Sequence, residues 1–389
     1  MFCHYTDYLA GVKQNDPTCG VRVALCLTEI QAIVRIRTHE LYGKSGCFMR
    51  IVVDAMGSDN HPGPDVAGAV MAAREFGDTI ILVGDSNQIE AELSQLDTAG
   101  LAIELEHATQ KVEMTDKPSE VVKGKPDSSM HVGLRLVREG AADAFVSAGN
   151  TGAVLGIAML RQVGLGRIPG VKRPALGVIF PTKERPLLID NGANADCRPE
   201  YLLQFAIMGT YYVERVLGVT NPRIALLSNG EEEGKGNSLI KETIPLLKES
   251  GLNYIGNIEP KEFMQGVADI GVTDGFTGNV MMKTAEAIAA YMSDLIRDEL
   301  MSNPLTMLGG LLARPAFARV RNRLNPDEVG GAPLLGVNGV VIIGHGRSNA
   351  YAIKQAIGQA RRMVENNVVE AIATGIQQGG RLKEGEQES

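Results

Sequence analysis

Short apolar runs alternate along this chain with longer segments in which apolar residues recur every three or four positions. The short runs predict strands and the longer segments predict amphipathic helices. The predicted strands are Arg50–Ala55, Thr79–Val83, Ile103–His107, Ala144–Ser147, Ala175–Phe180, Pro186–Asp190, Arg223–Ser228, Gly271–Thr273 and Val340–Gly344. The predicted helices are Asp65–Glu75, Ser86–Gln95, Asp127–Glu139, Gly152–Gln162, Arg198–Leu217, Ser238–Ser250, Thr277–Met301 and Ala350–Thr374. This alternation predicts an α/β fold, with a mostly parallel sheet covered by helices on both faces.

The pattern starts at Met49, where Met49-Arg50 runs into the apolar IVVDAMG. Residues 1–48 hold four of the five cysteines, without a C-x-x-C spacing, and a zinc site using His4 or His39 is the alternative interpretation. We expect residues 1–48 to be a poorly ordered extension or a start-site artefact. Residues 49–375 would form the α/β domain, and the polar, Gly-rich residues 376–389 a disordered tail.

Composition and charge exclude several classes of protein. The formal net charge is −8, Trp is absent and aromatic residues make up 5%, which argues against a nucleic-acid-binding surface. No apolar run reaches the roughly 18 residues that span a membrane. The N-terminus lacks a secretory pattern, and the cysteines do not form a disulfide framework, so we expect a cytoplasmic protein.

Four of the predicted strands end in short turns rich in Gly and Asn, each followed by a helix-like segment. Such turns aim backbone N–H groups and a helix N-terminus at one point, which favours an anion. In open α/β sheets ligands bind at the carboxyl ends of the strands. We therefore expect a phosphate-binding pocket built from these turns, although each turn taken alone is equally consistent with a helix cap. They are Ala148–Gly152, Asn229–Glu232, Asp274–Asn279 and Gly344–Gly346.

Other polar positions add candidate chemistry. Asn191 and Asn194 lie with Asp190 and Asp196 in a polar cluster at the end of a predicted strand. Such residues usually form local turns, and a site for a divalent cation is the alternative interpretation. We expect no metal there. Lys117 lies in a Gly/Pro-containing loop that can bring positive charge over a pocket. The run from Asn229 to Asn237 departs from a P-loop at both ends, and no motif of a catalytic Ser or Cys is present.

The segment 300–326 differs from the rest of the chain because it is apolar and cationic and contains no Asp or Glu. A stretch of this kind can lie on an anionic membrane surface. A subunit interface, or a helical hairpin that covers the core, explains the same pattern. The side chains that we expect at a membrane or carrier-protein contact are Leu308, Leu311, Leu312, Arg314, Phe317, Arg319, Arg321 and Arg323.

Several motifs together are similar to those of the bacterial phosphate acyltransferase family of phospholipid synthesis. The resemblance covers residues 49–366, with one departure at Ser58, where the family usually has Gly. The motifs are Val53–Asp59, Ser147–Ala153, Asp190–Asn194, Leu227–Glu232, Thr273–Asn279 and Gly330–Gly336. The resemblance implies a Rossmann-like fold akin to phosphotransacetylase and isocitrate dehydrogenase, a homodimer and peripheral membrane association. It also implies acyl transfer from acyl carrier protein to inorganic phosphate. The acyl phosphate would then be used by a membrane acyltransferase that acylates glycerol 3-phosphate.

This chemistry needs neither a cofactor nor an activated protein nucleophile, because phosphate is itself an anionic nucleophile at neutral pH. The expected phosphate and acyl ligands are Asn150, Thr151, Gly152, Asn191, Asn194, Gly230, Thr277, Gly278 and Asn279, and the expected catalytic residues are His345, Asn229 and Lys117. The alternatives are a phosphotransacetylase-like enzyme that uses acyl-CoA, a decarboxylating dehydrogenase of the related fold, and a non-catalytic lipid- or membrane-binding module.

Overall fold

A computed structural model describes residues 48–324 and 326–379 of the chain, and the side chains of residues 321–326 are outside the description. Met49 is the first residue of the compact unit that holds every element named below. The expectations for residues 1–48 therefore lie outside the described residues. Those for the tail do so only in part, because helix α14 (Val368–Gln377) continues through residues 376 and 377.

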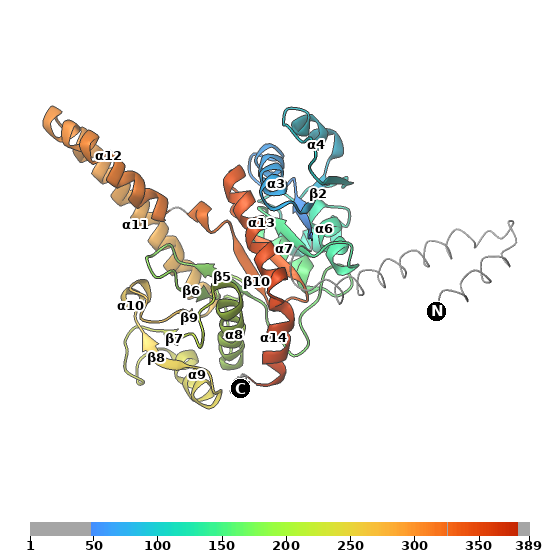
Figure 1. Cartoon of the computed structure of the whole chain (residues 1–389). Coiled ribbons are helices and arrows are strands. Elements are labelled where there is room, and N and C mark those ends of the chain that lie inside the picture. Colours follow the sequence, from blue (N-terminus) through green and yellow to red (C-terminus); the bar gives the residue numbers. More distant parts are fainter. Residues whose placement is uncertain (1–47, 325, 380–389) are drawn as a thin grey trace, which may run out of the picture. The chain divides into compact units, whose positions relative to one another are not determined.

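Eleven strands form one mixed sheet in the described chain, in the order β3-β2-β1-β4-β11-β10-β5-β6-β9-β7-β8 (Figure 1). All nine predicted strands are present, within one or two residues at most ends. β8 and β10 were missed, because β8 is half-buried and contains Gly256 and Asn257, while Pro333 in β10 is unusual inside a strand. The strands are β1 (Arg50–Asp54), β2 (Thr79–Gly84), β3 (Ile103–His107), β4 (Ala144–Ser147), β5 (Ala175–Ile179), β6 (Leu187–Ile189), β7 (Ile224–Leu227), β8 (Tyr254–Ile258), β9 (Ile270–Val272), β10 (Ala332–Leu335) and β11 (Val340–Ile343).

The sheet reverses direction near its middle. β1, β2, β3, β4 and β11 are mutually parallel, whereas β10 is antiparallel to both β11 and β5, and β5 is antiparallel to β6. Because β7, β8 and β9 run parallel to β6, this group points opposite to the first. The expectation that all four Gly/Asn turns share one edge is therefore wrong: those after β4 and β11 lie at one edge, and those after β7 and β9 lie at the other.

All eight predicted helices are present, with two local differences, and two short helices, Pro118–Gly124 and Pro260–Met264, were not predicted. The predicted helix Arg198–Leu217 ends in a π-helical turn, η1 (Val213–Leu217), and the predicted Ala350–Thr374 breaks at Asn367, whose φ is 49°. The helices are α3 (Gly63–Phe76), α4 (Ser86–Leu93), α5 (Pro118–Gly124), α6 (Ser129–Arg138), α7 (Thr151–Met159), α8 (Pro199–Tyr212), α9 (Ser238–Glu249), α10 (Pro260–Met264), α11 (Gly275–Met301), α12 (Pro304–Leu324), the 3-10 turn η2 (Pro326–Glu328), α13 (Ala350–Glu365) and α14.

The two faces of the sheet are packed differently. One continuous apolar cluster joins alternate strand residues such as Ile51, Val146 and Ile342 to helices α3, α8, α9, α13 and α14. The opposite face carries two separate clusters, one around Phe145 under α6 and α7, and one around Phe263 under α10 and the first turns of α11. The three-layer αβα arrangement is thus confirmed, and the second face is divided between the two halves of the sheet.

Helix α11 connects these halves. It begins at the carboxyl end of β9, yet Glu286, at the start of its fourth turn, lies 3.5 Å from the His345 imidazole after β11. Eleven residues of helix rise about 17 Å, which matches the length of a five-residue strand. α11 therefore crosses the sheet from one edge to the other.

Beyond Glu286, α11 lies alongside α12, and most side chains of the pair are exposed (Figure 1). Leu312 on α12 has 77% of its surface exposed and Tyr291 on α11 has 67%. The interpretation of segment 300–326 as a hairpin that covers the core is therefore wrong within the described residues. Its apolar side chains face outward.

Candidate active site

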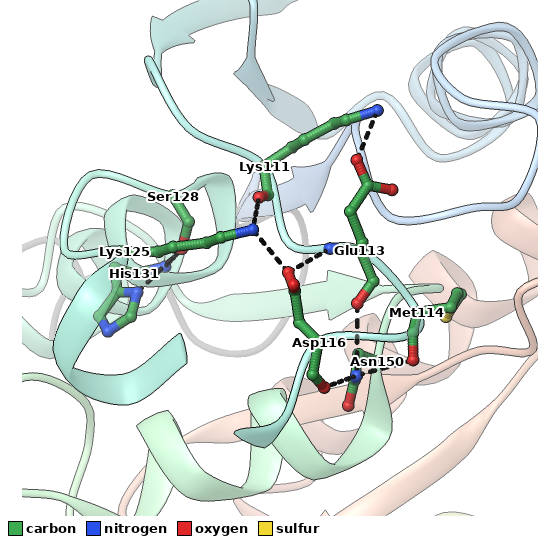
Figure 2. A network of polar contacts seen from close by, with 8 residues as sticks. All are labelled: Lys111, Glu113, Met114, Asp116, Lys125, Ser128, His131 and Asn150. Atoms are coloured by element: carbon green, nitrogen blue, oxygen red, sulfur yellow. Dashed lines mark hydrogen bonds and ion pairs between the residues drawn. The ribbon is translucent and has the colours of Figure 1, made fainter. Parts of the chain in front are cut away.

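Asn150, at the start of α7, holds a loop over one edge of the sheet. Its side-chain oxygen accepts a hydrogen bond from Ala153 N at 3.0 Å, which caps α7. Its side-chain nitrogen donates to the backbone carbonyls of Met114 at 3.1 Å and Asp116 at 3.0 Å, as Figure 2 shows. Lys125 closes the same loop by an ion pair with Asp116 at 2.5 Å. The Asn150 side chain is thus fully engaged with the protein.

The open donors of this turn are backbone groups. The first N–H groups of a helix have no partner within the helix, and Thr151 and Gly152 supply them at the start of α7. Lys117 is close by, because a Cβ on Gly152 would come within 2.6 Å of the neighbouring Pro118 ring. The Lys117 ammonium is 75% exposed and pairs with Glu120 at 3.3 Å.

Replacing Asn150 by Ala should therefore act on the loop as well as on the helix. We expect a loss of about 1–2 kcal/mol of stability from the cap and, in addition, a several-fold increase in the KM for phosphate, because the loop 113–117 loses its anchor. Asn237→Ala is the matched control, since Asn237 caps α9 in the same way, by accepting from Ile240 N at 3.0 Å. Steady-state kinetics and urea unfolding of both variants separate the two effects. Equal KM values would contradict the anchoring role.

Beneath the turn, buried carboxylates fix the strand ends. Asp54 at the end of β1 accepts from the Ser147 hydroxyl at 2.7 Å, and Ser147 in turn accepts from Gly149 N at 3.1 Å. The Ser58 hydroxyl donates to Asp65 at 2.5 Å. Burial raises the pKa of both carboxyl groups, that of Asp65 to about 8. These groups hold the Gly57 and Gly149 turns against each other, where an added Cβ on Gly57 would lie 3.0 Å from Gly149 N.

His345 brings together residues of two elements. Its Nε2 lies 3.5 Å from the Glu286 carboxylate of α11, and the side chain is 46% exposed. Partial burial lowers the pKa of His345, Glu286 opposes this shift, and the nearby positive charges of Lys283 and Arg347 add to it. The turn also contacts the segment that follows β1, because Asp59 N donates to Gly346 O at 2.7 Å. The site at His345 is therefore an exposed group of three basic side chains with one carboxylate.

The polar groups around Asp190 are hydrogen-bonded to one another and to the backbone. Asp190 is fully buried and accepts four hydrogen bonds, two of them from the backbone and side chain of Asn194 at 2.7 and 2.9 Å. Asn191 N donates to Leu176 O at 3.1 Å. Burial raises the pKa of Asp190 and, together with the charge of Asp190, raises that of the Cys197 thiol to about 12, so Cys197 remains protonated.

The N-terminus of α11 carries its own cap. The Asp274 carboxylate accepts from the backbone N–H and the hydroxyl of Thr277, both at 2.8 Å. The Gly278 N–H donates to the Asp274 carbonyl, and a Cβ on Gly278 would lie 2.0 Å from the Asp190 carbonyl oxygen. Thr277 and Gly278 therefore stabilise the turn at the start of α11. Thr277 and Asn279 are both exposed, but the Thr277 hydroxyl is bonded to Asp274, so Asn279, beside Gly192, is the candidate whose side chain is available.

Asn229 and Gly230 lie apart from the other candidates. β7 is five strand positions from β11, roughly 24 Å at about 4.8 Å per strand, and ends at the opposite edge. The Asn229 side chain accepts from Gly236 N at 2.9 Å and so closes its own loop. The structure of one chain does not bring Asn229 and Gly230 together with Asn150 or His345.

An open groove of about 570 Å³ follows one face of α11. It begins at Asn279 and Lys283 and continues over apolar residues. The lining residues are Asn279, Val280, Lys283, Thr284, Ala287, Ile288 and Tyr291. Since Lys283 also acts on His345, the groove and the cationic group are neighbours.

Glu286, Lys283 and Arg347 were missed as candidates. Glu286 and Lys283 lie inside a long predicted helix, where charged residues usually face solvent, and only the crossing of α11 brings them to His345. Arg347 follows the Gly344–Gly346 turn directly and was the one detectable from the sequence. Within residues 48–324 and 326–379, no three His, Cys, Asp or Glu side chains are grouped so as to hold a metal ion.

Comparison with known proteins places the chain in a family. The family model described as "Fatty acid synthesis protein" matches residues 49–371. "Phosphate acyltransferase" of Elusimicrobium minutum is 45% identical over 326 residues, covering 83% of this chain and 95% of that protein. "Phosphate acyltransferase" of Geobacter sulfurreducens is 46% identical over 326 residues, covering 84% and 93%.

Among solved structures, a phosphotransacetylase from Staphylococcus aureus matches with a TM-score of 0.52 and 17% identity, covering 84% of this chain and 96% of that one. At this identity the likeness shows the fold alone, and it agrees with the mixed sheet described above. The sequence relatives and the family model together show that this chain belongs to the phosphate acyltransferase family.

Proposed function

We propose that this chain transfers a fatty acyl group from acyl carrier protein to inorganic phosphate and forms an acyl phosphate for phospholipid synthesis. Its relatives are named phosphate acyltransferases, and the family model names fatty acid synthesis. The observation that carries the proposal is the adjacency of two features at Lys283: a cationic group around His345 and a groove with apolar lining along α11. The first suits the negative charge that develops on a thioester oxygen, and the second suits the acyl chain of the thioester.

In the proposed reaction a phosphate oxygen attacks the thioester carbonyl carbon. A carbon–oxygen bond forms, the carbon–sulfur bond breaks, and the thiolate of the carrier leaves and takes a proton from solvent. Phosphate is the nucleophile, so no protein nucleophile is needed, and Cys197 with its raised pKa is unsuited to that role. The protein's contribution is to hold the reactants in line and to stabilise charge.

The structure supports a division of roles among the candidates. Backbone N–H groups of Thr151 and Gly152, with Lys117 beside them, bind phosphate at the α7 N-terminus. His345, Lys283 and Arg347 stabilise the negative charge that develops on the thioester oxygen. Asn279 marks the polar start of the groove, and the acyl chain lies along Val280 and the residues that follow it on α11.

The test is direct formation of acyl phosphate. Purified protein, acyl-loaded carrier protein and phosphate are mixed, and the product is trapped with hydroxylamine as the hydroxamate. We expect hydroxamate above the background that the thioester itself gives with hydroxylamine only when the enzyme and phosphate are both present. Turnover with acyl-CoA but not with the carrier protein would indicate a phosphotransacetylase-like enzyme. No product with either donor would indicate a lipid-binding module without catalytic activity.

The exposed faces of α11 and α12 have a separate role in the proposal. α11 also exposes large apolar residues outside the groove lining, and we propose that these form the contact with a second copy of the chain: Phe276, Met292, Leu295, Ile296 and Met301. α12 exposes apolar and cationic residues, and we propose that these meet an anionic membrane or the acidic carrier protein. There the product passes to a membrane acyltransferase that acylates glycerol 3-phosphate. The exposed α12 side chains are Leu308, Leu311, Leu312, Arg314, Phe317 and Arg319; the side chains of Arg321 and Arg323 lie outside the described residues.

The membrane proposal predicts a specific loss. No helix in the described part of the chain is long and apolar enough to cross a bilayer, so contact would be at the surface. Leu311→Ser with Leu312→Ser should lower co-sedimentation with phosphatidylglycerol vesicles at least about tenfold, because burial of even one Leu contributes roughly 1.5–3 kcal/mol and about 1.4 kcal/mol is a factor of ten. Val267→Ser, which replaces an exposed apolar side chain outside α12, is the control. Undiminished binding by the α12 variant would count against membrane contact there.

A further inference from the structure

A second cavity, of about 490 Å³, lies on the face of the sheet opposite α11. It is enclosed by the loop between β5 and β6, the π-helical turn η1, the turn η2 and one side of α13. Tyr212 and Val213 are buried in its wall and belong, with α8, to the continuous apolar cluster of that face. The cavity is therefore distinct from the groove of the proposed active site.

Charges around this cavity are unevenly paired. Each of its three carboxylates has a partner within the described chain: Glu184 pairs with Lys183 at 3.3 Å, Asp269 with Arg223 at 2.8 Å, and Glu328 accepts from the Tyr351 hydroxyl at 3.0 Å. The two arginines of the lining, Arg185 and Arg362, make no hydrogen bond through the guanidinium and no ion pair with any described residue. Two cationic groups therefore remain available to a ligand.

Both guanidiniums act on one buried group. Arg185 and Arg362 line the same cavity as Tyr212, and their positive charges each oppose the rise in the pKa of Tyr212 that burial causes. That hydroxyl is 2.8 Å from the side-chain amide of Gln359, another buried residue of the lining. The polar end of the cavity is thus organised around Tyr212.

We propose that this cavity binds a small anionic amphiphile, with a single carboxylate or phosphate monoester head on a short apolar chain. The head pairs with Arg185 and Arg362, since charge-assisted hydrogen bonds to guanidinium are strong. The chain packs on Val216, Leu217 and Val219, which line the cavity. The three carboxylates of the lining disfavour polyanions such as nucleoside triphosphates.

The cavity also has a route to the proposed active site. Glu328 of its lining is the last residue of η2, and the preceding residue, Asp327, accepts a hydrogen bond from the Asn349 side chain at 2.8 Å. Asn349 caps α13 by accepting from Ala352 N at 2.9 Å and lies four residues after His345. Through these contacts, a ligand bound beside Glu328 changes the position of the turn that carries His345. Binding in this cavity should therefore alter the reaction rate.

Calorimetric titration with octyl phosphate and with octanoate tests the site, with octanol and sulfate as probes that lack the head or the chain. We expect saturable binding of one or both anionic probes only. The double variant Arg185→Gln/Arg362→Gln should weaken it at least about tenfold, or roughly 1.4 kcal/mol. Arg215→Gln is the control, because Arg215 is an exposed arginine of η1 outside the cavity lining and should change affinity less than about twofold.

Unchanged affinity in the double variant would overturn the proposal. So would binding that the double variant retains but Lys283→Gln removes, since this would assign the probe to the groove on α11. Kinetics test the route: the stronger-binding probe should change the rate of acyl phosphate formation non-competitively with phosphate in the wild type. It should leave the double variant unaffected. Purely competitive inhibition in both proteins would contradict the coupling.

Discussion

Asp190→Ala is expected to lower the free energy of unfolding by on the order of 3–5 kcal/mol. The Asp190 carboxylate accepts from Leu176 N at 3.0 Å, Ala193 N at 3.1 Å, and both the backbone and the side chain of Asn194. Truncation leaves the backbone N–H groups of Leu176, Ala193 and Asn194 without this acceptor, whereas the Asn194 side chain keeps its bond to Pro174 O. It also frees the turn against which Gly275 and Gly278 of α11 pack, so the start of α11 loses a packing contact with the sheet.

Urea unfolding followed by circular dichroism measures the change. Asp196→Ala is the matched control: Asp196 is an exposed carboxylate of the same turn, and its removal should change stability by less than about 0.5 kcal/mol. Asp190→Asn should fall between the two, since it keeps one acceptor and turns a donor toward Asn194. A loss below about 1 kcal/mol for Asp190→Ala would show that the turn reorganises and that this interpretation is wrong.

His345→Ala is expected to lower kcat/KM for acyl phosphate formation about 100-fold or more, comparable to the removal of one donor to a developing oxyanion. The Glu286 carboxylate favours the imidazolium form, whereas burial lowers the pKa of His345. Glu286→Gln should therefore move the alkaline limb of the pH–rate profile to lower pH, because the imidazolium is then lost sooner as pH rises.

The double-mutant cycle of His345→Ala and Glu286→Gln checks that both act together. With His345 absent, the shift in the pH profile caused by Glu286→Gln should vanish. His107→Ala is the control for loss of an imidazole, since His107 is exposed and bonded to Ser86 at 3.1 Å, far along the sheet. A shift that persists without His345 would assign the titration to another group.

The layers of the fold were predictable from the sequence because burial alternates with a period of two along each strand. In β1, Ile51 and Val53 face one apolar cluster while Val52 faces another, and the same holds for Ile342 and Val341 of β11. Strand direction was not predictable, since alternation is identical in parallel and antiparallel strands. The reversal at β10 and β5 depends on pairings between residues that are distant in sequence.

The candidate site was predicted in part for the same reason. Local features of the turns, such as the cap at Asn150 and the Gly344–Gly346 turn, follow from residue type and spacing. Whether two turns meet depends on topology: the structure separates Asn229 from Asn150 and brings Glu286 to His345. The family motifs point to these segments but give no information about which of their side chains are already bonded within the protein.

The reversed sheet also determines the order in which its strands can pair while the chain is being synthesised. Strands β6, β7, β8 and β9 pair among themselves within residues 187–272, so this group can assemble as soon as that stretch has been made. β4, by contrast, pairs on one side with β11, whose residues 340–343 come nearly two hundred positions later. Until they leave the ribosome, β4 presents an open strand edge with the apolar residues Ala144, Phe145 and Val146, which is prone to pair with other chains. The amino-terminal half of this protein is thus the part that most needs protection while the rest is translated.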